Sequence, residues 1–231
     1  MSDSLKRQAA TIALDEVRAD MVLGLGTGST MNFFIRGLGK RVQQGLAVST
    51  VATSLQSAAL AKECGVPVRT FREHKMLDLT VDGADEVSPD LDLVKGLGGA
   101  LVREKIVAKA SRRFVVVVDE SKLVDRLGVR APIPVEVLPF ARDLVEDTLA
   151  RIGGRPEVRM ADGAVFVSDN GNHILDWHVA PIEDPLSLET QLKAITGVID
   201  SGIFADLADR VIVAASDGVR LLDKPGTGNG S

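Results

Sequence analysis

The sequence lacks several features that would assign it to a narrow class of protein. Its 231 residues contain a single cysteine, Cys64, so no disulfide can form within the chain. It contains no run of about 18 apolar residues, the length that a membrane-spanning helix requires. Charged residues interrupt the N-terminal stretch MSDSLKRQAATIALDEV, which does not resemble a signal peptide. We therefore expect a cytoplasmic protein that does not enter a membrane.

A basic surface and the common catalytic signatures are also missing. The chain has 27 Lys and Arg against 32 Asp and Glu, a formal net charge of −5, whereas a nucleic-acid partner requires a basic face. The spacing of His74, His173 and His178 fits neither a metal site nor a catalytic triad. Because no G-x-S-x-G motif occurs either, we expect no nucleic-acid partner, no bound metal and no covalent hydrolase chemistry.

The apolar pattern of the first half predicts an α/β fold. Hydrophobic residues make up 45% of the chain, enough for a sizeable core. Short apolar segments such as 21–25 and 114–118 alternate with helical periodicities such as 4–17 and 100–110. This alternation is typical of a mostly parallel sheet with helices on both faces.

The pattern changes after the proline-rich segment APIPVEVLP. A helix over 142–152, two strands paired around the turn SDNGN and a helix over 185–195 predict a small α+β domain. Two late strands, RVIVAA and GVRLL, are predicted to return to the first sheet, and the tail KPGTGNGS is predicted to be loose. We therefore predict two domains: residues 1–130 with 208–231, and residues 131–207.

The stretch GLGTGST, residues 24–30, follows a short apolar strand and precedes a helix. Such a turn leaves backbone N–H groups pointing at one spot, which suits a phosphate. The dinucleotide fingerprint is incomplete because Ser29 stands where its third glycine belongs, and a P-loop is excluded because no Lys lies between Met21 and Arg36. A small phosphorylated metabolite and a plain tight turn both remain as interpretations.

Four polar turns follow predicted strands: Gly24–Thr30, Asp82–Glu86, Lys95–Gly99 and Asp119–Lys122. Because ligands of open parallel sheets bind at the carboxyl ends of the strands, we expect several of these turns to converge. The acidic turn DGADE is either a solvated turn or a group that handles protons on a hydroxylated substrate.

Two further residues are candidates for chemistry. Lys95 stands at a predicted strand end, where it can stabilise a developing oxyanion. Glu104 lies one turn into the next helix, and its helical neighbours include Ala100, Val107 and Ala108. It is either an ordinary surface residue or a general base in a partly apolar setting.

Eight segments in order resemble ribose-5-phosphate isomerase of the A type, over about residues 5–222: GLGTGST, VDGADEV, KGLGGALVREKIVA, DESKLV, PVEVLP, GGRPEVR, SDNGNHILD and DGV. The resemblance implies a Rossmann-like sheet with a smaller ferredoxin-like domain. It also implies interconversion of ribose 5-phosphate and ribulose 5-phosphate without metal or cofactor, in the pentose phosphate pathway, by a homodimer or homotetramer.

The resemblance also implies roles for single residues. Glu104 is the base that moves a proton between C2 and C1, Lys95 stabilises the enediolate, and Asp82, with Asp85, handles hydroxyl protons. We expect Asp82 or Asp85 to pair with Lys95. Leu97 stands where many members carry Gly or Arg, a departure that a backbone contact would survive. The implied substrate contacts are Thr27, Gly28, Ser29, Thr30, Asp82, Gly83, Ala84, Asp85, Lys95, Gly96, Leu97, Gly98, Lys122 and Lys6.

Other functions are compatible with the same sheet and glycine turn. Sugar-phosphate deaminases and lactonases would be expected to use a His near the ring, and no His lies in the four turns. A CoA transferase would need a nucleophilic Glu in its own motif. A non-catalytic sugar-phosphate sensor would usually carry a DNA-binding helix-turn-helix and a basic patch.

Overall fold

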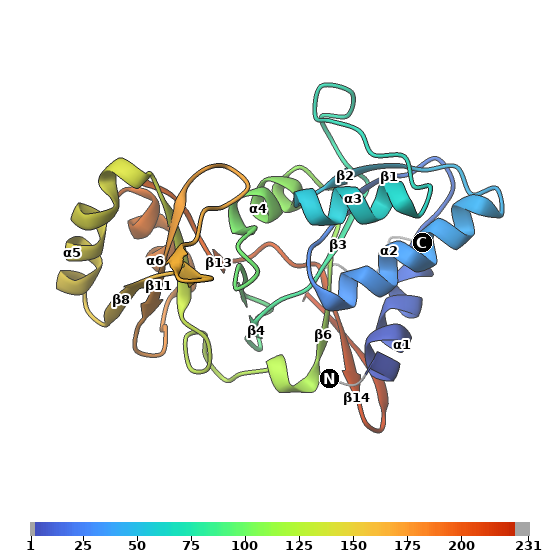
Figure 1. The fold of residues 1–231 in the computed structure, drawn as a ribbon. Helices are drawn as coiled ribbons and strands as arrows, with labels where there is room; N and C mark the ends of the chain where they lie inside the picture. Colours follow the sequence, from blue (N-terminus) through green and yellow to red (C-terminus); the bar gives the residue numbers. More distant parts are fainter. Residues whose placement is uncertain (1–2, 225–231) are drawn as a thin grey trace. The chain divides into compact units, whose positions relative to one another are not determined.

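The computed structural model describes residues 3–224, which divide into two compact units (Figure 1). Of the described residues, the first unit contains 3–84, Arg103–Lys122 and 207–224. The second unit contains Asp85–Val102 and Leu123–Asp206. The chain thus passes from one unit to the other four times.

A six-stranded sheet forms the centre of the first unit, in the order β15-β14-β6-β3-β1-β2. Five strands run parallel, and β15 pairs antiparallel with β14 at one edge. The strands are β1 (Val22–Leu25), β2 (Ser49–Ala52), β3 (Leu79–Asp82), β6 (Phe114–Asp119), β14 (Arg210–Ala215) and β15 (Gly218–Asp223). The helices are α1 (Asp3–Leu14), α2 (Ser29–Gln43), α3 (Leu55–Glu63) and α4 (Leu101–Lys109), followed by the short η1 (Glu120–Lys122) after β6.

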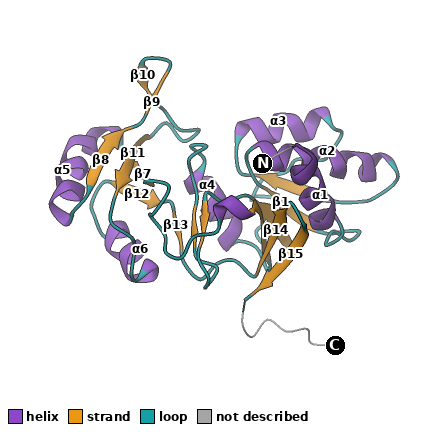
Figure 2. Cartoon of the chain, turned by 90° about the horizontal axis from the view of Figure 1, so that it is seen from below, coloured by secondary structure: helices purple, strands orange, loops and turns teal. Residues whose placement is uncertain are grey.

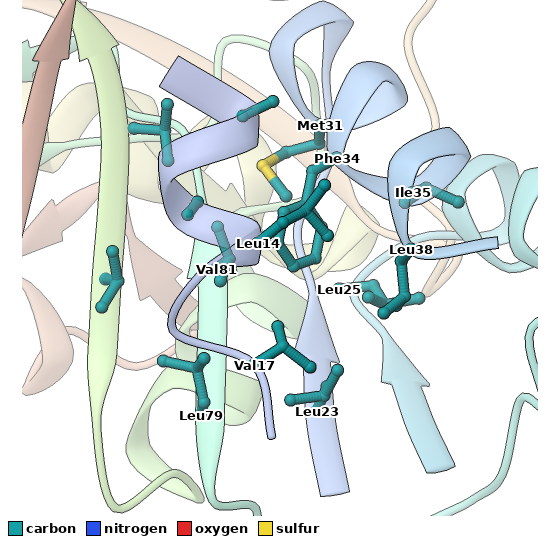
Figure 3. Close-up of a cluster of buried hydrophobic side chains, with 14 of the residues drawn as sticks. Leu14, Val17, Leu23, Leu25, Met31, Phe34, Ile35, Leu38, Leu79 and Val81 are labelled. Atoms are coloured by element: carbon teal, nitrogen blue, oxygen red, sulfur yellow. The ribbon is translucent and has the colours of Figure 1, made fainter. Parts of the chain in front are cut away.

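Alternation along the strands places helices on both faces of this sheet. Leu23 and Leu25 point to the face covered by α1 and α2, where the main core lies (Figure 3). Gly24, between them, faces Val107 of α4 on the other side. The predicted parallel sheet with helices on both faces, joined by the two late strands, is therefore confirmed.

The second unit is built on an antiparallel four-stranded sheet in the order β12-β7-β11-β8. Two helices cover one face of this sheet (Figure 2), and their apolar side chains enclose Trp177. The elements are β7 (Ile133–Val137), η2 (Pro139–Ala141), α5 (Arg142–Ile152), β8 (Arg155–Val158), β11 (His173–His178), α6 (Pro185–Lys193) and β12 (Val198–Ser201). A hairpin of β9 (Met160–Ala161) and β10 (Ala164–Val165) and a small sheet of β4 (Glu86–Val87), β5 (Leu93–Val94) and β13 (Ile203–Phe204) complete it.

Two sequence predictions about this region need correction. The strands on either side of SDNGN do not pair with each other, because β11 lies between β7 and β8 and has no free edge. The strand before Lys95 is not part of the parallel sheet, because β5 pairs antiparallel with β4 and β13. Both errors concern the partner of a strand, which local sequence does not encode.

The observed boundary between the units also differs from residue 131. Residues 85–102 and 123–130 pack with the second unit. Val94 joins the core around Trp177, and the buried Glu86 carboxylate accepts hydrogen bonds from the backbone N–H groups of Gly128 and Arg130, both at 2.6 Å. Glu86, at the end of the acidic turn, therefore has a structural role.

Over residues 3–224, none of the helices combines the length and the apolar character that crossing a membrane requires. The predicted loose tail lies outside these residues apart from Lys224, whose backbone N–H donates to the carbonyl of Asp209.

The ion pairs of Glu16 are expected to contribute to the stability of the first unit. Its carboxylate, 16% exposed, accepts hydrogen bonds from Arg113 and Arg210, both at 2.6 Å, and so joins the turn after α1 to the residue before β6 and to the first residue of β14. Glu16→Gln should lower the free energy of unfolding by about 2 kcal/mol in urea denaturation, because Arg113 loses the carboxylate it is paired with and Arg210 keeps only Asp223. Asp15→Asn is the control: Asp15 is 67% exposed in its pair with Arg41, so the loss should stay below about 1 kcal/mol. Equal losses in the two variants would contradict this prediction.

Candidate active site

Two glycines shape the GLGTGST loop for different reasons. A Cβ at Gly26 would lie 2.0 Å from Oδ1 of Asp82, so only glycine allows this approach. Gly28 has a φ of +113° at the N-cap of α2, a conformation that L side chains rarely adopt. The backbone of this loop therefore lies close to Asp82, and the loop ends at the N-terminus of α2.

Asp82, the last residue of β3, is fixed against this loop. It is 1% exposed, and its Oδ1 accepts hydrogen bonds from the N–H of Thr27 at 3.0 Å and of Gly83 at 2.7 Å. Two of the four predicted turns are therefore in contact, as expected for neighbouring parallel strands. The turn after β6, which contains Lys122, follows a third strand of the same sheet.

A cluster of hydroxyl groups beneath the loop escaped the sequence reasoning. The Thr27 hydroxyl lies 2.8 Å from those of Thr53 and Ser54, and Ser57 Oγ donates to the Gly26 carbonyl at 2.7 Å. Ser54 also caps α3 by accepting from the N–H of Ser57 at 3.0 Å. The signal was present in the sequence, because the pair Thr53-Ser54 directly follows β2, the sheet neighbour of β1.

Glu104 lies on α4 and is 5% exposed, so the interpretation as an ordinary surface residue is excluded. Lys105 beside it is 2% exposed, which the sequence reasoning did not anticipate. Val107, one turn on, packs with Val51 and Leu77. Burial of consecutive ionisable residues on a short helix is costly, and it marks this turn of α4 as a candidate for function.

In the second unit, Lys95 follows β5 and is 2% exposed. Its backbone N–H donates to the carbonyl of Gly202 at 2.8 Å. Its Nζ lies 5.5 Å from the centroid of the Phe204 ring, a cation–π distance. The side chain of Lys95 is thus held by the strand that pairs with β5.

Asp85 is connected to the turn that follows Lys95. Its Oδ2 accepts a hydrogen bond from the N–H of Leu97 at 3.0 Å, and its own N–H donates to Val94. The Leu97 side chain is 43% exposed, and the hydrogen bonds found at Leu97 involve only its backbone. These backbone contacts do not depend on the side chain at this position, so they tolerate the departure from the family pattern.

Each unit carries part of the predicted set. The second unit holds the contiguous group Lys95, Gly96, Leu97 and Gly98 together with Asp85. The first unit holds Lys6, Thr27, Gly28, Ser29, Thr30, Asp82, Gly83, Ala84, Glu104 and Lys122.

Two of the predicted residues, Lys6 and Lys95, enter separate predictions. Lys6, on α1, forms an ion pair with Asp3 at 3.7 Å. The pairing of Asp82 or Asp85 with Lys95 stays a prediction.

Comparison with known proteins identifies the family. The fold and the buried side chains of Asp82, Glu104 and Lys95 define an α/β protein with buried acidic and basic groups at its candidate site. Residues 49–218 match the family model of ribose 5-phosphate isomerase A (phosphoriboisomerase A). Ribose-5-phosphate isomerase A of Roseiflexus castenholzii is 48% identical over 229 residues, which cover 97% of this chain and 98% of that protein. The chain belongs to the ribose 5-phosphate isomerase A family.

Solved structures agree with this assignment. A D-ribose-5-phosphate isomerase in complex with phospho-erythronic acid is 42% identical, with a TM-score of 0.94 over 96% of this chain and 100% of that one. Ribose 5-phosphate isomerase A of Methanocaldococcus jannaschii is 41% identical, with a TM-score of 0.93 over 97% and 100%. The deaminase, lactonase, CoA transferase and sensor alternatives are not favoured by these matches.

Proposed function

We propose that this chain interconverts D-ribose 5-phosphate and D-ribulose 5-phosphate through a cis-enediolate. The observation that supports this most directly is the burial of Glu104, Asp82 and Lys95, which are 5%, 1% and 2% exposed. Ionisable side chains are rarely buried unless they are paired or functional, and these three are the catalytic residues that the family resemblance implies.

The proposed chemistry moves two protons and conserves all atoms. Glu104 takes the proton from C2 of the open-chain aldose, and the electron pair of the broken C–H bond forms a C1–C2 double bond while the carbonyl pair moves to O1. The protonated Glu104 then returns its proton to C1. Asp82 relays the proton of the C2 hydroxyl toward O1, so that C2 becomes the ketone.

Lys95 supplies the electrostatic part of this reaction. A C–H bond next to an aldehyde is a weak acid, so most of the acceleration must come from stabilising the negative charge on the enediolate oxygen. An ammonium group that is buried and already held against Phe204 needs little reorganisation when that charge appears.

The substrate contacts proposed here follow the matching positions of the family. Thr27–Thr30 lie at the N-terminus of α2, where the N–H groups of the first helical turn and the helix dipole favour an anion. Lys122 adds a positive charge, and Lys6 reaches the phosphate. The remaining contacts are Gly83, Ala84 and Asp85 after β3 and Gly96, Leu97 and Gly98 after β5.

The test is ketose formation from ribose 5-phosphate by protein treated with EDTA. We expect turnover without added metal or cofactor. Phospho-erythronic acid, the ligand of the solved relative, should inhibit competitively because its carboxylate resembles the enediolate. Absence of ketose at saturating ribose 5-phosphate would contradict the proposal.

Gly26→Ala tests the contact between the glycine loop and Asp82. The new Cβ would lie 2.6 Å from Cα of Asp82, so one of the two strands must move. We expect kcat/KM to fall about 100-fold, because a displacement near 1 Å costs about that much. Gly45→Ala is the control: its Cβ meets no atom within 4 Å, although its φ of +99° adds a backbone strain that Gly26→Ala does not have. Comparable kcat/KM values in both variants would show that the approach of Asp82 is not needed.

We also propose that the protein is a homodimer or homotetramer located in the cytoplasm. Phe140 is 99% exposed and Leu144 71% exposed, and apolar side chains this exposed are typical of surfaces that contact another chain. Light scattering coupled to size-exclusion chromatography should give two or four times the mass of the chain, and a monomer would contradict the proposal.

A further inference from the structure

The loop that carries Lys95 is held by a side chain that has no part in the proposed chemistry. Arg159 lies directly after β8, and its side chain is 10% exposed. Its Nη1 donates to the carbonyl of Gly96 at 2.8 Å and to that of Leu97 at 3.2 Å. One guanidinium nitrogen thus binds two consecutive carbonyls immediately after Lys95.

The direction of this guanidinium is set by Asp176. Nε of Arg159 donates to Asp176 Oδ2 at 2.9 Å, and Nη2 donates to Oδ1 of the same carboxylate. Such a bidentate pair fixes the plane of the guanidinium. Asp176 lies on β11, which is paired on both sides, so the arginine is anchored to a central strand of its sheet.

An aromatic ring supports the same loop. The ring centroid of Phe166 lies 5.8 Å from the guanidinium carbon of Arg159. A Cβ at Gly99 would lie 2.4 Å from Cζ of Phe166, and Gly99 has a φ of +82°. The glycine therefore lets the loop rest directly on the ring, and its N–H donates back to the Gly96 carbonyl at 2.9 Å.

The loop is consequently held on several sides within one unit. Asp85 binds the N–H of Leu97, the Gly202 carbonyl binds the N–H of Lys95, and Arg159 binds the carbonyls of Gly96 and Leu97. Losing the arginine leaves the peptide that follows Lys95 with one anchor fewer. The ammonium of Lys95 would then sample a wider range of positions.

We propose that Arg159, oriented by Asp176, is a positioning residue for the isomerisation. It fixes the Lys95–Gly99 loop so that Lys95 stands where charge develops on the enediolate oxygen. The inference rests on the proposed function, because it assumes that Lys95 is the enediolate stabiliser. It needs no contact between Arg159 and the substrate.

The first test separates positioning from charge by kinetics. Arg159→Met should lower kcat for ribose 5-phosphate by about 10- to 100-fold and change KM by less than about threefold, since the loss concerns placement of a group that acts in the transition state. Arg159→Lys should recover only part of this loss, because it keeps the charge but not the planar fork. Arg155→Met is the matched control: Arg155 is on the same β8, its side chain is 69% exposed, and kcat should stay within about twofold.

The second test does not depend on activity. Hydrogen exchange of the amides of residues 95–99 should accelerate at least about tenfold in Arg159→Met and remain unchanged in Arg155→Met. The emission of Trp177, the single tryptophan and a neighbour of Asp176, should be the same in both variants if the sheet is intact. Asp176→Asn combined with Arg159→Met should add little to Arg159→Met alone, because the two residues act through one contact.

Either of two results overturns the proposal: loop exchange and kcat of Arg159→Met that match the Arg155→Met control, or full recovery of kcat by Arg159→Lys. An inactive wild-type protein would contradict the proposed function instead. The exchange rates would still decide whether Arg159 holds the loop.

Discussion

Replacing Glu104 by Gln is expected to lower kcat for ketose formation by about 10³- to 10⁴-fold. The amide has nearly the same shape as the carboxylate but cannot take the C2 proton. Binding should survive, so the Kd of phospho-erythronic acid should change by less than about tenfold. The measurement is ketose formation after EDTA treatment, together with calorimetric titration of the inhibitor.

Glu63→Gln is the control for Glu104→Gln. Glu63 is the last residue of α3 and is exposed, so the same chemical change should leave kcat within about twofold. Thermal unfolding of both variants checks that the first unit remains folded. If Glu104→Gln stayed active, the general base would have to be sought in the acidic turn, at Asp82 or Asp85.

Replacing Lys95 by Met should lower kcat by about 10²- to 10³-fold, the usual effect of losing one group that stabilises an oxyanion. Methionine fills most of the volume of this buried side chain, so the loss reports on the charge rather than on a cavity. Lys95→Ala should lose at least as much activity and also some stability.

Trp177 provides a folding check for the Lys95 variants, because both residues lie in the second unit and unchanged emission indicates an intact core. Lys62→Met, at an exposed position near the end of α3, is the control for removing a positive charge and should keep wild-type kcat. Near-normal turnover of Lys95→Met would remove Lys95 from the mechanism.

Much of the fold could be predicted from the sequence because it depends on local patterns. The helix predicted over 142–152 is α5, since its apolar positions recur at helical spacing and Gly153 follows it. The glycine turn after β1 was predicted because short apolar strands followed by helices imply a parallel sheet, whose ligands bind at the strand ends.

The partners of short strands could not be predicted in this way. The two residues of β5 look like one more strand of the parallel sheet, but they pair with β13 from a distant part of the chain. The Asn-Gly turn in SDNGN is a local hairpin signal, yet β11 pairs with β7 and β8 instead. Pairing is decided by which apolar face each strand buries, and that depends on the rest of the fold.

The sequence by itself determined the family and the candidate residues, because each motif is a short run of residues with its own chemistry. Only the tertiary structure decided which of them are buried and what holds them. Gly26 admits Asp82, the hydroxyl of Ser57 supports the glycine loop, and Arg159 binds the carbonyls after Lys95. These contacts join residues from different strands and loops, so their geometry depends on strand order and register, which no local pattern specifies.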